Sequence, residues 1–292
     1  MNILLLTTYQ SDITNAKNSI NIDPALYKMS TGIIYEYLKK DHEVTLALFT
    51  QLSLTISKQG IDIKYNSIDL KSYDVIFFRS VDDKGLDLEW LAQIVADYAL
   101  VNKIKTINAN HYSLFGCRWN KIQQIEIFKS NGFLVPDTMF GIIEKPQFPL
   151  IAKPIFGSQG KGIYLVSSNE QLSINSNELY QELLPNKEDY RVIVLGKKVL
   201  GVMLRKANDS SIVSNISAGG IGTKYNYDSQ LEEISLRLAQ LCKLDFCGID
   251  LMKDASGDYA VLEVNRNPGI QGFQKATGVE VAEEIGKYLT TL

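Results

Sequence analysis

Hydrophobic positions in the first hundred residues alternate between two kinds of spacing. Short apolar runs are typical of strands, namely NILLLT at 2–7, EVTLALF at 43–49, YDVIFFRS at 73–80 and KTIN at 105–108. Between these runs, apolar residues recur at helical spacing over 26–38 and 88–98. This order of elements predicts a small open α/β sheet.

The pattern changes after a further helix, which we expect over about 118–130 and ended by Asn131-Gly132. Six segments read as strands: TMFGII, PLIAKP, GIYLV, LYQELL, DYRVIVLG and KVLGVMLRKA, with glycine-containing gaps at 157–162 and 207–227. A helix at about 229–242, a strand hairpin and a last helix after Thr277 complete the chain. We therefore expect an α/β (α+β) protein with domains at 1–108, 109–187 and 188–292.

Composition excludes several classes of protein. The 292 residues are 45% apolar and 22% charged, and a net charge of −3 provides no basic field for nucleic acid or an anionic membrane. We find neither a signal peptide nor a membrane-length apolar run, and three cysteines fit a reduced, cytoplasmic protein. Because the two histidines, His42 and His111, are far apart, any metal would have oxygen ligands.

The segment FCGIDLMKDASGDYAVLEVN, at 246–265, reads as two strands around a turn. With Ser256-Gly257 at the tip, Asp250 lies opposite Glu263, and Asn265 points to the same face. The other face is expected to be the core face and carries Ile249, Leu251, Leu262 and Val264. Facing carboxylates repel, and Mg²⁺ would remove that repulsion. An ordinary hairpin with a solvated polar face is the equally good alternative on composition alone.

The segment IAKPIFGSQGKGIYLV, at 151–166, places a glycine-rich loop between two strands. Glycines at this density let the backbone direct N–H groups toward an anion, although the spacing matches neither Walker A nor the Rossmann fingerprint. We expect a hairpin whose loop forms a flap over phosphates, and an ordinary glycine-rich turn is the alternative. Lys121 and Lys153 supply positive charge, but each alone also fits a solvated lysine.

The segment LYQELLPNKEDYRVIVLG, at 179–196, is expected to connect two subdomains. Its extended part would offer backbone groups to a flat base and the side chains of Gln181 and Glu182 to the edge of that base. Asp189, which follows, could accept hydrogen bonds from ribose hydroxyls.

Arg191 and Arg205 lie on successive strands, and their relative position depends on the turn that joins them. A turn at 196–197 pairs Arg205 with Glu188 and places the two arginines on opposite faces. A turn one residue longer pairs Arg205 with Asp189 and brings both arginines to one face. The sequence leaves both registers open, and a surface cation on an outer face is the alternative for each arginine.

Taken in order, these segments resemble the ATP-grasp superfamily, and specifically its RimK-like carboxylate–amine ligases. That branch includes the ribosomal-protein glutamate ligase and the LysX-type ligases. The resemblance covers about 115–290 and is most specific in LEVNRNPGIQGFQKATGVEVAEEI, at 262–285. It implies an ATP-grasp fold with an N-terminal pre-ATP-grasp α/β domain, a central lid subdomain and a C-terminal antiparallel-sheet subdomain that holds the metal site.

The resemblance also implies cofactors and site residues. The cofactors would be ATP and Mg²⁺, as two ions, with Mn²⁺ as an alternative. Lys121 and Lys153 would hold the phosphates and the adenine side of ATP. The lid over the phosphates would be formed by Gly157, Ser158, Gln159, Gly160, Lys161 and Gly162. Adenine would be read by Gln181, Glu182, Leu183 and Leu184, ribose by Asp189, and the metal would be held by Asp250, Glu263 and Asn265. The catalytic residues would be Arg205, which stabilises the transferring phosphoryl group, Arg191 and Asn215.

Departures from the family pattern concern the substrates. Ala218 stands where the family often has a basic residue, and Arg266 and Asn267 stand where small residues are common. Arg266 could therefore clamp a substrate carboxylate, with Asn267 beside it. The long loop TTYQSDITNAKNSINIDPALYKM, at 7–29, is a second candidate for substrate contact, and a merely structural loop is its alternative.

The leading hypothesis for function is ligation. A carboxylate would attack the γ-phosphorus of ATP, and an amine would then displace phosphate from the acyl phosphate to form an amide. We expect an amino acid such as glutamate to be added to a small molecule, a peptide or a protein, by a cytoplasmic homo-oligomer that binds neither nucleic acid nor membrane. The alternatives are an ATP-grasp small-molecule kinase and a non-catalytic ATP-binding module.

Overall fold

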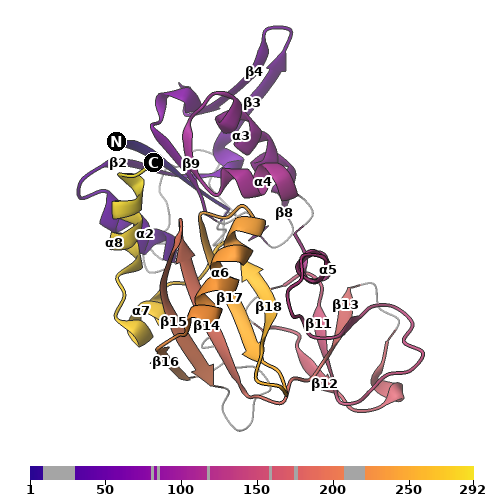
Figure 1. Cartoon of the computed structure of the whole chain (residues 1–292). Coiled ribbons are helices and arrows are strands. Elements are labelled where there is room, and N and C mark those ends of the chain that lie inside the picture. The colour runs from indigo at the N-terminus through magenta and orange to yellow at the C-terminus, as the bar shows by residue number, and fades with distance from the viewer. Residues whose placement is uncertain are drawn as a thin grey trace.

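The computed structural model describes residues 1–8, 30–79, 82–83, 86–116, 119–157, 160–173, 177–206 and 221–292. The predicted site residues Ser158, Gln159 and Asn215, the departure at Ala218 and most of the loop over 7–29 lie outside these ranges. Three larger sheets, of four, four and five strands, carry the described part of the fold (Figure 1). None of the helices in these ranges is long and apolar enough to cross a membrane.

The N-terminal sheet has four parallel strands in the order β2-β1-β6-β9. The strands are β1 (Asn2–Thr7), β2 (Glu43–Leu48), β6 (Val75–Phe78) and β9 (Lys105–Ile107). Three helices pack on its two faces, α2 (Ser30–Leu38) on one side and α3 (Glu89–Val101) and α4 (Ala109–Phe115) on the other. Both faces of the sheet are thus buried, which explains the continuous apolar runs in its strands. The predicted open α/β sheet is confirmed, although α4 was not expected.

A three-stranded antiparallel meander between β2 and β6 was not expected either. It consists of β3 (Leu52–Ser57), β4 (Gly60–Tyr65) and β5 (Ile68–Asp69), and it extends away from the rest of the molecule (Figure 1). One face of its ladder is apolar, with Ile63 and Tyr65 buried in the N-terminal core, and the pair of Ile56 and Ile61 at the far end is exposed. The alternation of apolar and polar residues in these strands is the signal that could have predicted them. A short pair, β7 (Asp82–Asp83) and β8 (Leu86–Asp87), precedes α3, and three single 3₁₀ turns cover Phe49–Gln51, Leu70–Ser72 and Asn169–Gln171.

The central sheet is antiparallel, with the order β10-β13-β11-β12. It comprises β10 (Thr138–Met139), β11 (Leu150–Pro154), β12 (Tyr164–Val166) and β13 (Glu178–Glu182). The predicted strand TMFGII is reduced to the two residues of β10. A small core of Leu150, Ala152, Val166 and Tyr180 holds this sheet together. We call it the lid sheet.

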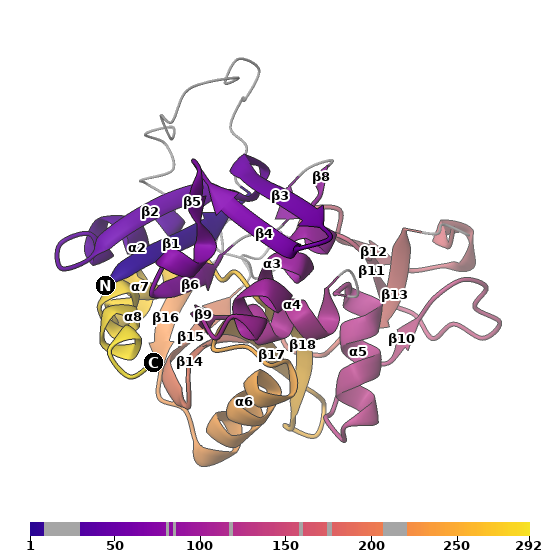
Figure 2. The same cartoon turned by 90° about the horizontal axis from the view of Figure 1, so that it is seen from above.

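The C-terminal sheet is antiparallel, with the order β16-β15-β14-β17-β18. Its strands are β14 (Glu188–Leu195), β15 (Lys198–Lys206), β16 (Ile221–Tyr225), β17 (Phe246–Lys253) and β18 (Tyr259–Asn265). α6 (Ser229–Leu241) packs on one face, and α5 (Lys121–Ser130) lies between β18 and the lid sheet in both views (Figure 1, Figure 2). The chain ends in α7 (Gln271–Thr277) and α8 (Val281–Leu289), of which α7 was not expected.

The other face of the C-terminal sheet changes character along each strand. On β14, the alternate residues Asp189 and Arg191 are polar, whereas Ile193 and Leu195 belong to a core that also contains β1, β6, α2 and α8. The apolar half of this face is therefore covered by the N-terminal domain. The polar half follows at the opposite end of the same strands, where the candidate site lies.

Asn108 joins the N-terminal domain to the C-terminal sheet. Its Nδ2 donates to the carbonyls of Phe246 (2.9 Å) and Arg266 (3.4 Å), and its Oδ1 accepts from the N–H groups of Asp245 and Phe246, each at 2.9 Å. The residue is fully buried and has a left-handed backbone with φ of 72°. One asparagine thus fixes the start of β17 and the residue after β18.

We expect Asn108→Ala to lower the free energy of unfolding by about 3 kcal/mol, because it leaves buried backbone groups unpaired and forces alanine into a left-handed conformation. Denaturant unfolding measures this loss. Asn102→Ala is the matched control, since the Asn102 side chain makes one hydrogen bond, to the carbonyl of Tyr98 at a helix end, and should cost less than about 1 kcal/mol. Equal losses of unfolding free energy in the two variants would show that the Asn108 side chain does not hold these segments together.

Candidate functional site

The β17–β18 hairpin brings two carboxylates opposite each other. Asp250 pairs with Glu263 across the ladder, as predicted. The turn is longer than predicted, because Lys253 pairs with Tyr259 and the Asp254 side chain accepts from the N–H groups of two turn residues. A bulge between the Asp250 and Leu251 pairs restores the register.

The bulge also corrects one predicted core residue. Leu262 is the extra residue on β18 and is only partly buried. Val261, which was not expected in the core, occupies that place with 0% exposure beside Ile249, Leu251 and Val264. The prediction for Leu262 was therefore wrong, because it assumed a two-residue turn followed by a ladder without a bulge.

The β14–β15 hairpin brings both arginines to one face. Leu195 pairs with Lys198, so the turn has the shorter of the two predicted lengths. A bulge beyond Ile193 then shifts the ladder, and Asp189 pairs with Arg205 as the longer turn had required. The turn of one alternative and the register of the other thus occur together.

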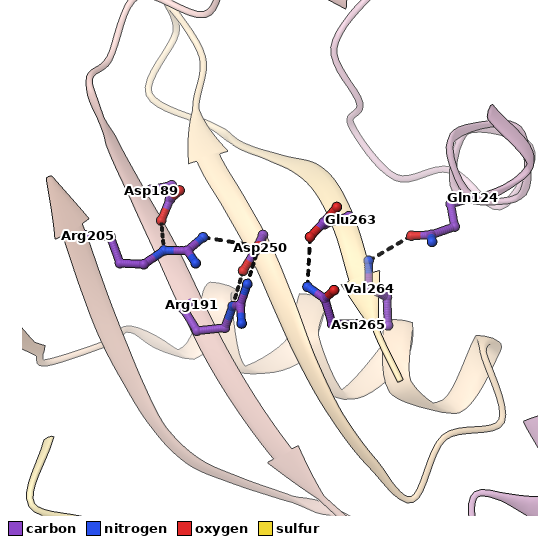
Figure 3. Close-up of polar contacts among 8 residues, drawn as sticks. All are labelled: Gln124, Asp189, Arg191, Arg205, Asp250, Glu263, Val264 and Asn265. Carbon is purple, nitrogen blue, oxygen red and sulfur yellow. Dashed lines mark hydrogen bonds and ion pairs between the residues drawn. The ribbon is translucent and has the colours of Figure 1, made fainter. Parts of the chain in front are cut away.

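Asp250 is the centre of a buried ion-pair network (Figure 3). Arg191 binds it through two nitrogens, with Nη2 2.6 Å from Oδ2 and Nε on Oδ1, and Nη2 of Arg205 lies 3.1 Å from Oδ2. Arg205 also binds Asp189, with Nε to Oδ1 at 2.5 Å. Asp189, Arg205 and Asp250 are each about 5% exposed or less, so water screens these charges weakly.

The network fixes the charge of its members. Burial alone would raise the pKa of the Asp250 carboxyl, but Arg191 and Arg205 outweigh it and lower that pKa to about 2. Burial likewise opposes the charged form of Arg205, and Asp250 and Asp189 overcome it, raising the pKa of that guanidinium. Asp250 is therefore ionised and Arg205 is charged across the physiological pH range.

Glu263 and Asn265 complete the polar face on β18. The Asn265 amide donates to Oε1 of Glu263 at 2.8 Å (Figure 3). Between them, Val264 points to the core, and its backbone is held from outside the sheet by Gln124, which accepts from its N–H at 2.8 Å, and by Trp119, whose indole donates to its carbonyl at 3.3 Å. The edge strand β18 is thus paired along its outer side, which fixes its ladder groups.

Sequence reasoning missed Gln124 and Trp119. Gln124 is buried on the α5 face that also carries Ile125 and Phe128, and a polar residue on an apolar helix face is the signal that could have found it. Its partner lies 140 residues away, so no local pattern reveals the contact.

The three predicted metal ligands suit a hard cation. Their side chains offer carboxylate and amide oxygens on one face, which is the donor chemistry that Mg²⁺ prefers. Among the described residues no group of three or more His, Cys, Asp or Glu could hold a metal ion, so a metal here would need the amide oxygen of Asn265 beside the two carboxylates. The residues present therefore fit Mg²⁺.

The glycine-rich loop joins β11 and β12 in an antiparallel hairpin, as expected. Gly157, Gly160 and Gly162 all have positive φ, between 71° and 145°, a backbone conformation that other residues rarely adopt. Lys121, the first residue of α5, donates to the Gly157 carbonyl at 2.7 Å and so lies at the base of this loop. Lys161 lies in the described part of the loop and is exposed.

Lys153 lies on β11 and reaches toward the carboxylates. Its Nζ donates to Oε1 of Gln181 at 2.5 Å, and the Gln181 amide donates to Thr138 at 2.9 Å. Burial lowers the pKa of the Lys153 ammonium to about 8, with Lys121 adding to the decrease and Glu263 opposing it. Lys153 is therefore a cation that titrates close to physiological pH.

We expect the KM for ATP to rise as the pH increases through about 8. Lys153 is charged below its pKa and neutral above it, so its attraction for phosphate is present at pH 7 and lost by pH 9. In Lys153→Met the KM should be higher and this step absent, whereas Lys129→Met, an exposed lysine at the end of α5, should keep the wild-type profile. An unchanged step in Lys153→Met would assign the titration to another group.

The predicted adenine-reading segment leaves the lid sheet at β13. Gln181 is buried within that sheet, and Glu182 accepts from the Asp137 N–H at 3.2 Å. Leu183 and Leu184 follow β13 and lie in the connection between the lid sheet and β14. Leu183 is 39% exposed, and Leu184 is buried. The side chain of Gln181 is occupied by Lys153 and Thr138, whereas roles for this segment toward adenine, and for Asp189 toward ribose, stay predictions.

The structure places Arg266 in the interface with the N-terminal domain. Its guanidinium forms an ion pair with Glu89 at the start of α3 and lies over the ring of Tyr112, 5.1 Å from its centroid. The residue is 4% exposed. These contacts give Arg266 a role in joining the domains, and its predicted role as a substrate clamp, like that of Asn267, is not tested by them.

Two curated relatives are similar to this chain. Human beta-citrylglutamate synthase B is 29% identical over 213 residues, which cover 62% of this chain and 55% of that protein. The chain thus spans little more than half the length of that relative. A probable alpha-L-glutamate ligase of Trichodesmium erythraeum (strain IMS101) is 25% identical over 289 residues, covering 92% of this chain and 94% of the relative.

Solved structures identify the fold. The ATP-grasp ligase PsnB, in complex with a phosphomimetic variant of its minimal precursor, Mg and ADP, superimposes with a TM-score of 0.71 at 16% identity, over 99% of this chain and 97% of PsnB. The fold is therefore the ATP-grasp fold. The sequence profile of the RimK-like ATP-grasp domain matches residues 121–289, which is more than half of the chain. The chain belongs to the RimK-like ATP-grasp family.

Proposed function

We propose that this protein is an ATP-dependent carboxylate–amine ligase. The observation that carries the proposal is the single polar face on which Asp250 and Glu263 oppose each other, with Asn265, Arg191 and Arg205 beside them. Such a face can hold a metal–nucleotide and neutralise the charge that develops during phosphoryl transfer. The names of the two relatives, a citrylglutamate synthase and a probable glutamate ligase, support the same conclusion.

The chemistry proceeds in two steps. A substrate carboxylate oxygen attacks the γ-phosphorus, and the bond from that phosphorus to the β–γ bridging oxygen breaks. ADP departs, and the substrate becomes an acyl phosphate. The amine nitrogen then attacks the acyl carbon, phosphate departs with the bonding electrons, and the nitrogen loses a proton to give the amide. Arg205 and Lys153 would stabilise the transferring phosphoryl group, and the glycine-rich loop would exclude water that hydrolyses the acyl phosphate.

Magnesium would be held by Asp250, Glu263 and Asn265. When bound, it would supply positive charge to the phosphate oxygens and orient them. Two bound ions stay a prediction, because Arg191 and Arg205 already bind both oxygens of Asp250. Mn²⁺ can replace Mg²⁺ at oxygen ligands. Arg191 would keep Asp250 oriented toward the nucleotide, and Asn215 remains a candidate for closing over the acceptor.

Glutamate is the amino acid that we propose as amine, since the names of both relatives contain it. The acid is a small molecule, a peptide or a protein tail, and the precursor bound to PsnB supports the peptide option for that ligase. A cytoplasmic location and a homo-oligomeric state stay predictions.

The test combines ATP, Mg²⁺ and pairs of carboxylic acids and amino acids with the purified protein, and follows ADP, phosphate and product mass. We expect equal amounts of ADP, free phosphate and an amide whose mass is that of both substrates less one water. A product that retains the phosphoryl group would make the protein a kinase. Binding of ATP with no turnover of any pair would make it a binding module.

A further inference from the structure

Arg79 lies where an open α/β sheet binds its ligands. It follows β6, and its N–H donates to the Leu6 carbonyl at 2.8 Å, so it is at the carboxyl end of the two central strands. The chain passes from β1 to β2 on one side of the sheet and later to β6 on the other side. The gap between β1 and β6 is therefore a topological switch point, where ligands of such sheets commonly bind.

Among the residues that the structure describes, the buried guanidinium of Arg79 has no anionic partner. The side chain has 0% exposure, and neither Nε nor Nη1 has a hydrogen-bond partner in that part of the chain. Nη2 makes one long bond, of 3.4 Å, to the Pro268 carbonyl. The one N–H of Nε and the two of Nη1 thus lack acceptors. Burial lowers the pKa of this guanidinium to about 10, so it remains charged at neutral pH.

A buried charge without a partner is costly, and proteins rarely keep one for stability alone. Two rings partly compensate, since the guanidinium carbon lies 5.6 Å from the centroid of Phe77 and 5.2 Å from that of Phe246. These contacts satisfy none of the three N–H groups. A guanidinium presents parallel N–H groups in two planar forks, Nε with Nη2 and Nη1 with Nη2, and either fork matches a carboxylate.

The turn that Arg79 contacts belongs to the candidate site. Pro268 follows Asn265, the last predicted metal ligand, by three residues, which span at most about 10 Å even when fully extended. Asn267 lies between them, and its Oδ1 is buried without a hydrogen-bond partner. A small molecule could therefore have one group at the magnesium ligands and a second at Arg79.

We infer that Arg79 binds a substrate carboxylate other than the one that is phosphorylated, and that the enzyme acts on a substrate with at least two carboxylates. Nη2 uses one of its two N–H groups on Pro268, so its other N–H would donate together with the neighbouring Nε or Nη1 to the two oxygens of that carboxylate. The inference rests on the proposed function for the identity of the ligand as substrate. It adds the residue that recognises this carboxylate.

Calorimetric titration of the full chain with Mg·ADP present tests this inference. The probes are glutarate, L-glutamate, citrate and N-acetyl-L-aspartate, with butyrate as the single-carboxylate reference. We expect the wild type to bind at least one of the four more tightly than butyrate, and Arg79→Met to weaken that binding about 10- to 100-fold. Arg79→Lys, which keeps the charge without the fork, should fall between them, and Arg237→Met, an exposed arginine on α6, should bind as wild type.

Thermal unfolding separates binding from structure. Because Arg79 has no anionic partner, Arg79→Met should leave Tm unchanged or raise it. A markedly lower Tm, undiminished binding in Arg79→Met, or no preference of the wild type over butyrate would each overturn the inference.

Failure of the proposed function gives a different result. In that case no pair of substrates yields an amide, while Arg79-dependent binding of the carboxylates persists. Conversely, amide formation with equal KM for the acid and the amine in wild type and Arg79→Met would leave the ligase standing and remove Arg79 from its site.

Discussion

Glu263→Gln is expected to lower the rate of ADP formation at least about 10³-fold, or roughly 4 kcal/mol in the activation free energy. Glutamine keeps the shape of the side chain but removes the charge that faces Asp250 across the β17–β18 ladder. Without that charge the face retains one carboxylate for a divalent cation, and it is already shared with Arg191 and Arg205. The loss should therefore appear in kcat and in the Mg²⁺ concentration for half-maximal rate.

The fold of this variant should persist, because the described contact of the Glu263 side chain is its bond to Asn265 and glutamine can accept the same bond. Asp258→Asn is the matched control, since it removes a carboxylate from the exposed turn of the same hairpin and should leave both kcat and Tm unchanged. Wild-type rates for Glu263→Gln at saturating Mg²⁺ would disprove the metal assignment.

The candidate site was predictable to the extent that it depends on local strand pairing. The Asp250–Glu263 pair followed from the alternation of β17 and β18, although two deviations had to cancel. The Asp254 side chain lengthens the turn by capping two N–H groups, and Leu262 forms a bulge that restores the register. Asp at the start of such a turn is a known signal, whereas the bulge has none in the sequence.

Contacts between distant segments account for what the sequence did not reveal. Asn108 and Gln124 bind backbone groups 137 to 140 residues away, and Arg79 reaches a carbonyl 189 residues away. The local sequence does not reveal these partners, because each side chain contacts a segment far away along the chain. Asn108 in particular lies at a helix start, where asparagine is expected to cap, but its side chain binds the next domain instead.

Arg205→Met is expected to affect both activity and stability. Arg205 lies between Asp189 and Asp250, and its removal leaves Asp189 buried without the cation that it binds, a change that costs about 3–5 kcal/mol of unfolding free energy. The same cation is the one we propose for the transferring phosphoryl group, so the rate of ADP formation should also fall about 10²- to 10³-fold. Arg205→Lys should recover part of the rate and part of the unfolding free energy. Lysine restores the positive charge but cannot bind Asp189 and Asp250 through separate nitrogens, as arginine does.

A double variant distinguishes the two effects. Adding Asp189→Asn to Arg205→Met removes the carboxylate that lost this cation, whereas Asp250 keeps its pair with Arg191, and we expect the double variant to recover at least about 1 kcal/mol of unfolding free energy in denaturant titrations. The rate of ADP formation at saturating ATP should stay at the level of Arg205→Met, because no cation has been returned to the phosphoryl group. If the rate recovered together with the stability, Arg205 would act only by holding the two carboxylates in place, and the catalytic role would have to pass to Arg191 or Lys153.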